Sequence, residues 1–224
     1  DAMGGDNSPQ KTIDGVVMFL VKNEKKNDFL LKLYGDKKKI YSELKKFTYP
    51  KHLLEIIHTN NVISDEETPL TAIKNSKNTS MWNCIKAQTE GGANISLSAG
   101  NTGVLLVISR MILKMMSQVS RPALAGLWPN EKGMNVVLDL GANIECDDIN
   151  LIDFAELGSA LYKSLFPNEK PLVALLNIGS EEIKGTDILK KTYKKLSELS
   201  NENNFIFNGY IEGNKIMNGD SNVI

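Results

Sequence analysis

A short apolar strand, a loop rich in Gly, Asn and Ser, and a helix follow one another four times in the pattern of this chain. The four copies contain DAMGGDNSP (1–9), ANISLSAGNTG (93–103), VVLDLGAN (136–143) and LVALLNIGSEEIKGT (172–186). Open α/β sheets bind ligands in loops at the carboxyl ends of their strands. Small residues there let backbone N–H groups approach an anion at a helix N-terminus. The pattern therefore predicts an α/β protein whose loops share one cleft, with phosphate as the expected ligand.

The spacing of apolar residues predicts further elements between these loops. It indicates a helix over 13–21, behind the start signal Ser8–Pro9, and a strand over 29–34. Further helices are expected over 39–47 and up to Gln88, with a short apolar segment at 52–57 and a strand at 222–224. The most apolar helix, 103–116, is expected to be buried against the sheet. This burial could include a dimer contact, and a binding surface for an apolar chain is the alternative for that helix.

Composition narrows the class of protein. With 224 residues and 42% hydrophobic content, the chain can form one large core or two lobes. The net charge of −1 gives no electrostatic reason to expect nucleic acid as a partner. Its two cysteines and two histidines have no metal-ligand spacing, so we expect neither a zinc site nor a disulfide framework. The histidines also offer no base for serine-hydrolase chemistry.

The second loop concentrates polar donors at a helix start. Ser98, Asn101 and Thr102 place hydroxyl and amide groups where the first backbone N–H groups of the helix are unpaired. Capping alone requires one such residue. Three of them, together with Gly100 and Gly103, predict that the loop binds a ligand as well as capping the helix.

The fourth loop resembles a phosphate-binding P-loop only superficially, because a P-loop has Gly directly before Lys. Lys184 instead precedes Gly185, and Glu181 and Glu182 lie nearby in the sequence. We therefore reject nucleoside triphosphate as the ligand. Three interpretations of Lys184 stay open: a fixed cation for phosphate, a nucleophile if burial lowers its pKa, and a surface lysine neutralised by the glutamates.

Other charged residues are candidates for the same site. Lys74 and Lys77, three residues apart, could share a helical face and contact phosphate or a partner, or could be ordinary surface lysines. Arg121 could hold a phosphate with two parallel hydrogen bonds, or form a salt bridge between lobes. Acidic residues in the loops are expected to order them through backbone hydrogen bonds; these are Asp1, Asp6 and Asp139.

The sequences of five motifs and their order along the chain are specific enough to indicate a family. DAMGGDN, SAGNTG, RPALAGLWP, LDLGAN and LLNIGSEEIKGT follow one another between residues 1 and 224. In this order they resemble the acyl-acyl-carrier-protein:phosphate acyltransferases of bacterial phospholipid synthesis, the PlsX type. Members of that family begin with a strand before the first motif and continue past a further Gly-rich loop. The resemblance therefore implies that this chain is a fragment of the enzyme.

The resemblance also implies an architecture and a location. The expected fold is a three-layer α/β/α arrangement like that of isocitrate and isopropylmalate dehydrogenases, with a mostly parallel sheet and two lobes around a cleft. The lobes are expected at residues 1–98 and 99–224. The expected protein is a cytoplasmic homodimer that acts on acyl carrier protein and inorganic phosphate. Peripheral contact with the inner membrane would involve the segment beyond residue 224.

The implied reaction is attack of inorganic phosphate on the thioester of an acyl carrier protein, which gives acyl phosphate and free carrier. A thiol leaves readily because its pKa is about 8.5, so no metal or organic cofactor is expected. Lys184, as an electrostatic partner, and Asn101 are the candidate catalytic residues. The candidate substrate- and phosphate-binding residues are Asp1, Gly4, Gly5, Asp6, Asn7, Lys74, Lys77, Ser98, Gly100, Thr102, Gly103, Arg121, Asp139, Gly141, Asn143, Asn177, Gly179 and Gly185.

The sequence leaves alternative functions open. A phosphate acetyltransferase that uses coenzyme A would share the attack by phosphate, and a non-catalytic module would only bind the carrier protein. A metal-dependent decarboxylating dehydrogenase would need several arginines for a dicarboxylate substrate, whereas this chain has only Arg110 and Arg121.

Overall fold

The computed structural model describes residues 1–64, 66–179, 181, 184–200 and 205–224. It consists of two compact units, Asp1–Lys114 and Met115–Ile224. The predicted lobes divide after Ser98, whereas the compact units divide after Lys114. The difference is the helix between these points, which packs with its neighbours in the first unit. The lobe boundaries of the complete protein stay a prediction.

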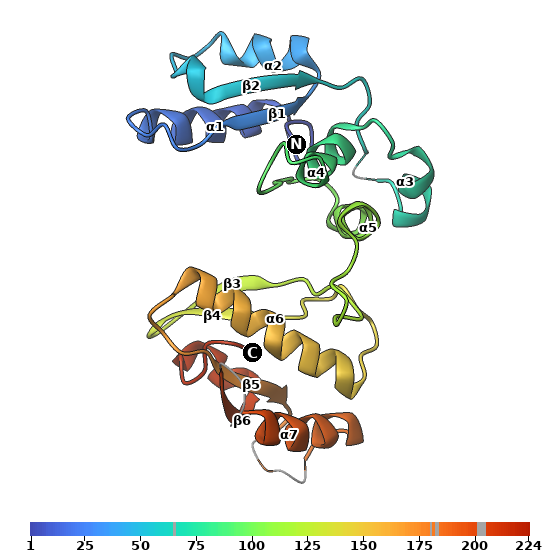
Figure 1. Ribbon diagram of the computed structural model, residues 1–224, viewed down its shortest axis with the longest axis vertical. Helices are drawn as coiled ribbons and strands as arrows, with labels where there is room; N and C mark the ends of the chain where they lie inside the picture. Colours follow the sequence, from blue (N-terminus) through green and yellow to red (C-terminus); the bar gives the residue numbers. More distant parts are fainter. Residues whose placement is uncertain (65, 180, 182–183, 201–204) are drawn as a thin grey trace. The chain divides into compact units, whose positions relative to one another are not determined.

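The first unit is built on two parallel strands, β1 and β2 (Figure 1). Its elements, in chain order, are α1 (Gln10–Lys22), β1 (Leu31–Gly35), α2 (Lys37–Leu44), the 3-10 helix η1 (Lys51–Leu53), β2 (Leu54–His58), α3 (Pro69–Asn75), α4 (Ser80–Thr89) and α5 (Thr102–Leu113). The predicted helix over 13–21 and strand over 29–34 are confirmed by α1 and β1. The expected helix over 39–47 is confirmed by α2, which begins and ends earlier than predicted.

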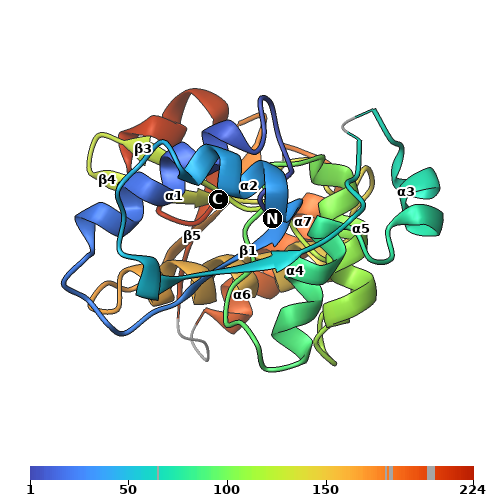
Figure 2. The ribbon, with the colours of Figure 1, turned by 90° about the horizontal axis from the view of Figure 1, so that it is seen from above.

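Side chains that alternate along β1 and β2 are buried on both faces of this two-stranded sheet. Leu33 and Ile56 pack with the apolar side chains of α1 and α2, whereas Tyr34 and Ile57 pack with Cys84 and its neighbours on α4. Successive residues of a strand point to opposite faces, so α1 and α2 cover one face and α4 covers the other (Figure 2). Helices on both faces are typical of parallel α/β sheets.

The second unit contains a sheet of mixed direction. Its elements are β3 (Gly126–Asn130), β4 (Gly133–Val137), α6 (Asp148–Leu165), β5 (Leu172–Asn177), α7 (Asp187–Leu199), β6 (Ile206–Glu212) and the 3-10 helix η2 (Gly213–Asn218). β3 and β4 form an antiparallel hairpin, and β5 pairs with β6 in parallel. Val223 bridges in parallel to both Val136 of β4 and Val173 of β5. Residues 222–224, predicted as a strand, form only these isolated bridges, through which they join the two strand pairs.

Both faces of this second sheet are also covered. Val173 and Val223 pack on the side of α6 and α7, whereas Ala174 and Ile224 pack with Ile216 of η2. β4 and β5 run parallel to the same segment, so their carboxyl ends lie at the same edge of the sheet. The loops 138–147 and 178–186 follow these two ends and lead into α6 and α7.

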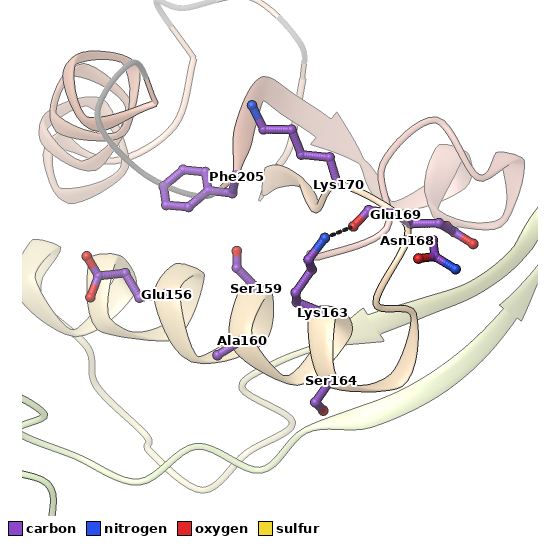
Figure 3. Close-up of a pocket in the computed structure, with 9 residues that line it drawn as sticks. All are labelled: Glu156, Ser159, Ala160, Lys163, Ser164, Asn168, Glu169, Lys170 and Phe205. Atoms are coloured by element: carbon purple, nitrogen blue, oxygen red, sulfur yellow. Dashed lines mark hydrogen bonds between the residues drawn. The ribbon is translucent and has the colours of Figure 1, made fainter.

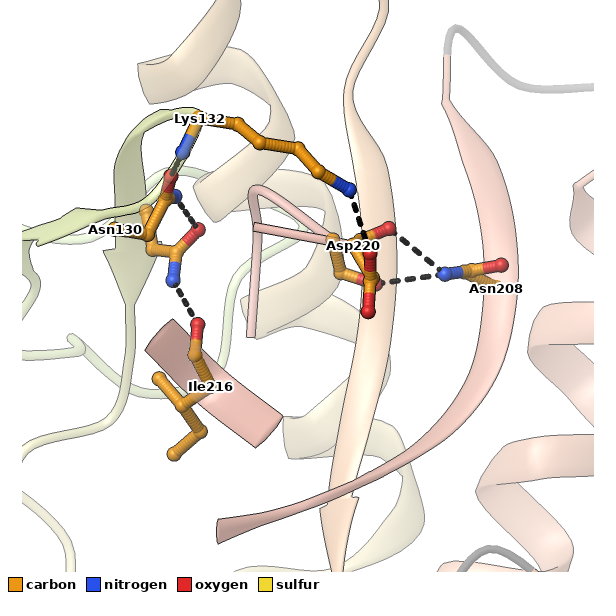
Figure 4. A network of polar contacts seen from close by, with 7 residues as sticks. Asn130, Lys132, Asn208, Ile216 and Asp220 are labelled. Atoms are coloured by element: carbon orange, nitrogen blue, oxygen red, sulfur yellow. Dashed lines mark hydrogen bonds and ion pairs between the residues drawn. The ribbon is translucent and has the colours of Figure 1, made fainter. Parts of the chain in front are cut away.

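A network of polar contacts joins the β3–β4 hairpin to η2 (Figure 4). The side chain of Asn135 is fully buried; it donates to the carbonyl of Ile216 at 2.7 Å and accepts from Asn130 at 2.6 Å. On the surface, Lys132 pairs with Asp220 at 2.6 Å. Because buried amides are costly without partners, Asn135 holds the hairpin against η2.

Two expectations about elements are wrong. Residues 93–98 form no strand; Ile95 and Leu97 are both largely exposed, so the segment lacks the buried face that strand pairing accompanies. The helix expected at 103–116 ends at Leu113, because Lys114 takes a left-handed conformation with φ 64°. Its buried side chains, Val104 and Ile108, pack with side chains of α4 and with Ala72 of α3 rather than against the sheet.

Candidate functional site

The first two glycine loops cross each other in the first unit. A Cβ atom at Gly4 would lie 2.7 Å from the backbone N of Gly100, and one at Gly5 would lie 2.8 Å from the carbonyl O of Ala99. Gly5 also has φ +86°, a conformation that favours glycine. These glycines allow the two backbones to approach at a distance that any side chain would prevent.

Polar contacts hold this crossing together. Asp1 accepts a hydrogen bond from the Ser98 hydroxyl through Oδ2 at 2.7 Å, and from the backbone N–H of Met3 through Oδ1 at 3.0 Å. The Ser98 hydroxyl in turn accepts from the backbone N–H of Gly100 at 3.2 Å. Asp1 therefore orders the loops through hydrogen bonds, as the sequence analysis expects.

Asn101 caps α5 at the same place. Its Oδ1 atom accepts from the backbone N–H of Val104 at 3.1 Å, and its Nδ2 atom donates to the carbonyl of Glu67 at 3.2 Å. Both ends of this amide are thus engaged within the protein. Thr102 lies exposed at the first position of the helix. Gly103 is packed closely, because a Cβ atom there would lie 3.2 Å from the ring of Pro69.

A cavity of about 490 Å³ opens beside the crossing. Its lining combines predicted site residues from both loops with residues of α1, and comprises Asp1, Gly4, Gly5, Asp6, Lys11, Thr12, Gly15, Val16, Leu97, Ser98 and Ala99. The residues of α1 in this lining, including Lys11, were not among the predicted site residues. Helical periodicity identified only the buried face of that helix. Asn7, an expected ligand of phosphate, is exposed in the loop before α1 and has φ 56°.

In the second unit, Asp139 organises the third loop. Its carboxylate accepts from the backbone N–H groups of Leu124, Ala142 and Asn143 at 2.8, 3.1 and 2.7 Å, and from the side chain of Asn143 at 2.9 Å. Partial burial raises the pKa of Asp139, but these hydrogen bonds together outweigh it and hold the pKa below its usual value. Gly141 provides the turn with φ +97°.

Asn143 and Arg121 connect this loop to the RPALA segment. Asn143 donates from Nδ2 to the carbonyl of Pro122 at 2.8 Å. The exposed guanidinium of Arg121 donates to the carbonyl of Glu145 at 2.6 Å. The structure thus gives Arg121 a backbone partner within its own unit, which neither sequence interpretation anticipated.

The fourth loop brings Lys184 back toward the end of β5. Asn177 donates from Nδ2 to the Lys184 carbonyl at 3.1 Å, and its Oδ1 atom would lie 2.6 Å from a Cβ at Gly185, which has φ +94°. The ammonium of Lys184 lies 2.8 Å from a carboxylate oxygen of Glu181, which raises the pKa of the lysine. The side chain also runs so close to Gly179 that a Cβ atom there would collide with Cδ of Lys184. A raised pKa keeps Lys184 charged, which supports the interpretations as a cation over that as a nucleophile.

The expected partner Glu182 lies outside the residues that the structure describes. Thr186 caps α7, where its hydroxyl accepts from the backbone N–H of Leu189 at 3.3 Å. The third and fourth loops share the carboxyl edge of the second sheet.

The expectation that Lys74 and Lys77 share a helical face is wrong. α3 ends at Asn75, and Lys77 lies in the turn before α4. The helix breaks there because Thr79 caps α4 through a hydrogen bond from the backbone N–H of Trp82, and Asn78 adopts φ 66°. Both lysines are exposed.

A larger cavity of about 870 Å³ lies elsewhere in the second unit (Figure 3). Lysine and glutamate side chains of α6 and the following turn line it, and Lys163 donates to the carbonyl of Glu169 at 3.1 Å. Two further lining residues lie just before strands: Lys170 is two residues before β5, and Phe205 directly precedes β6. The cavity is therefore at the amino end of these strands, away from the edge where open α/β sheets bind ligands. Among the described residues, no three His, Cys, Asp or Glu side chains group in a way that could hold a metal ion.

Comparison with known proteins supports the family that the order of the motifs indicates. The family model described as "Fatty acid synthesis protein" matches residues 1–224. The chain belongs to this family. It is 53% identical to the "Phosphate acyltransferase" of Pelagibacter ubique and 40% identical to that of Parvibaculum lavamentivorans, and in both cases 100% of the chain is aligned. It spans 66% and 61% of the lengths of these relatives.

Two solved structures share the fold of the chain. The EutD phosphotransacetylase from Staphylococcus aureus matches with a TM-score of 0.64 at 18% identity, over 94% of this chain and 73% of that one. A branched-chain phosphotransacylase from Enterococcus faecalis matches with a TM-score of 0.54 at 13% identity, over 99% and 76%. The chain therefore has a mixed α/β fold of the kind found in phosphotransacylases. None of its described helices is long and apolar enough to cross a membrane.

Proposed function

We propose that the complete protein is a phosphate acyltransferase of phospholipid synthesis, which converts long-chain acyl-acyl carrier protein and inorganic phosphate to acyl phosphate and free carrier protein. The names of relatives up to 53% identical support this proposal. The structural observation that carries it is the crossing of Gly4 and Gly100 beside a cavity that contains Lys11. Bare backbone and an ammonium group next to a helix start suit a small anion.

The chemistry needs few protein groups. An oxygen of phosphate attacks the thioester carbon, the C–S bond breaks, and the carrier leaves as a thiolate that then takes up a proton. The protein must hold the phosphate about 3–3.5 Å from the carbonyl carbon, and it must supply donors for the oxyanion that develops. Backbone N–H groups and lysine ammonium groups meet both needs.

We assign Lys184 to the charge that develops in the transition state, and Asn101 to fixing the start of α5 near the phosphate. The remaining phosphate-binding assignments from the sequence are kept as part of this proposal. Pairing with Glu181 keeps the Lys184 ammonium protonated, which supports an electrostatic role over a covalent acyl-lysine. An acyl-lysine is an amide, which phosphate would cleave less readily than a thioester.

Further features of the complete protein belong to the same proposal. They are the three-layer α/β/α arrangement, the homodimer, the cytoplasmic location and peripheral contact with the inner membrane. Family membership supports them indirectly.

Incubation of the full-length protein with palmitoyl-acyl carrier protein and phosphate tests the proposed reaction, with acyl phosphate detected by mass spectrometry. We expect acyl phosphate and free carrier in equal amounts. A parallel reaction with acetyl-coenzyme A distinguishes the phosphate acetyltransferase, which would turn over that substrate instead. Carrier binding without turnover of either substrate would leave only a binding module.

A further inference from the structure

The cavity beside the crossed loops continues along α1, past a glycine for which packing gives no reason. Gly15 lies in the middle of α1, where glycine costs about 1 kcal/mol relative to alanine. A Cβ atom at this position would have no heavy atom within 4 Å. Gly15 lines the cavity together with Val16 and Leu97. The missing side chain therefore leaves open space on the cavity side of the helix.

The polarity of the lining changes in one direction along this helix. Near the glycine loops, the cavity presents Asp6, Lys11 and Thr12. One turn further along α1, it presents Gly15 and Val16, and Leu97, which is 76% exposed, also lines the cavity.

Beyond the cavity, apolar side chains continue on the same face of α1. Met18 and Phe19 lie three and four residues after Gly15, and they are 74% and 47% exposed. The ring of Phe19 also contacts that of Phe29, with centroids 5.3 Å apart. From Lys11 to Phe19, the helix rises roughly 12 Å. A polar end and an apolar end are thus separated along one continuous stripe.

We infer that this stripe binds the acyl chain of the thioester substrate, and that Gly15 sets how long a chain is accepted. The inference rests on the proposed function, because the polar end of the stripe is the proposed phosphate site. A long-chain thioester has the matching polarity: a reacting carbonyl at one end and a hydrocarbon tail behind it. Covering Val16, Leu97 and Phe19 with that tail would remove their apolar surface from water, which is favourable.

The variant Gly15→Leu in the full-length protein tests this inference. Leucine is a good helix former, and its side chain would occupy the open space over the stripe. We expect kcat/KM for palmitoyl-acyl carrier protein to fall by roughly tenfold or more. The value for hexanoyl-acyl carrier protein should stay within about twofold, because a short chain ends before the blocked position.

Three controls separate the effect on the acyl chain from other effects. Gly15→Ala adds only a methyl group in open space, so it should lower kcat/KM for the palmitoyl substrate far less than Gly15→Leu does. Asp14→Leu adds the same side chain at the neighbouring position, which does not line the cavity, and should not alter chain-length preference. Leu97→Ser, at an exposed position, should weaken use of the palmitoyl substrate without affecting folding.

Binding of the S-hexadecyl thioether of pantetheine, measured by calorimetry, gives a readout that does not depend on turnover. We expect the Gly15→Leu variant to bind this compound at least about tenfold more weakly than the wild type does. Absence of turnover by the wild type with every acyl carrier substrate would overturn the proposed function, and the thioether would still report on the stripe. Equal effects of Gly15→Leu on both chain lengths, or none, would overturn the inference. A change in oligomeric state in this variant would identify the stripe as a protein contact instead.

Discussion

Lys184 is an exposed residue whose surroundings are nevertheless specific. Its ammonium lies 2.8 Å from Glu181, and its aliphatic stem runs against Gly179. In the full-length enzyme, Lys184→Ala should lower kcat by about 10²–10³, the usual loss for a preorganised donor to a developing oxyanion. Lys184→Arg should not restore the rate, because a planar guanidinium differs in shape from a compact ammonium.

Steady-state kinetics with palmitoyl-acyl carrier protein check this prediction, and thermal unfolding should show almost no change in stability. Lys195→Ala is the matched control, because Lys195 forms a similar surface pair with Asp148 at 2.6 Å. Near wild-type turnover in Lys184→Ala would return Lys184 to the ordinary surface lysines. The site assignment would then move to Lys74, Lys77 and Arg121.

A second prediction for a single residue concerns the contribution of Asn135 to stability. Asn135→Ala removes two hydrogen bonds and leaves the Ile216 carbonyl and the Asn130 amide without this partner. The free energy of unfolding should fall by about 1–3 kcal/mol. Urea denaturation measures this loss. Lys132→Ala, which breaks a mostly exposed pair with Asp220, should cost much less stability than Asn135→Ala does. Similar losses for the two variants would contradict the role of Asn135.

At the scale of elements, the third loop depends on one ionised carboxylate. The pKa of Asp139 is lower in the folded protein than in the unfolded chain, where it is about 3.9. The ionised form therefore stabilises the fold above about pH 4, and this contribution is lost as the pH falls through the folded-state pKa. Asp139→Asn should reduce stability at neutral pH, because an amide offers one acceptor oxygen in place of two.

Urea denaturation of the wild type and of Asp139→Asn between pH 7 and pH 3 measures this effect. The difference in stability between the two proteins should be largest at neutral pH and should shrink toward the acid end. A difference that is constant over this range would show that the charge of Asp139 does not stabilise the loop.

At the scale of the whole molecule, the second and fourth loops belong to different compact units. Their meeting in one cleft therefore stays a prediction for the complete protein. The chemistry of the proposed reaction leads to a further prediction, because a thiolate leaves without the help of a Lewis acid. Acyl transfer by the full-length enzyme should keep its rate after treatment with EDTA. Loss of activity that magnesium restores would revive the dehydrogenase-like alternative.

The sequence by itself determined the local elements and the family. Apolar periodicity located α1 and β1, because this signal depends only on neighbours in the chain. The order of five motifs indicated the family that the comparison then showed. Small residues in the loops also marked the crossing at Gly4 and Gly100.

Only the tertiary structure decided which exposed residues face the site. Lys11 and Gly15 were not predicted as site residues, yet they line the cavity together with Leu97, a residue far away in the chain. In the same way, residues 93–98 read as a strand, although they form none. Periodicity reports which face of an element is apolar, but strand pairing and cavity lining depend on contacts between segments far apart in the chain.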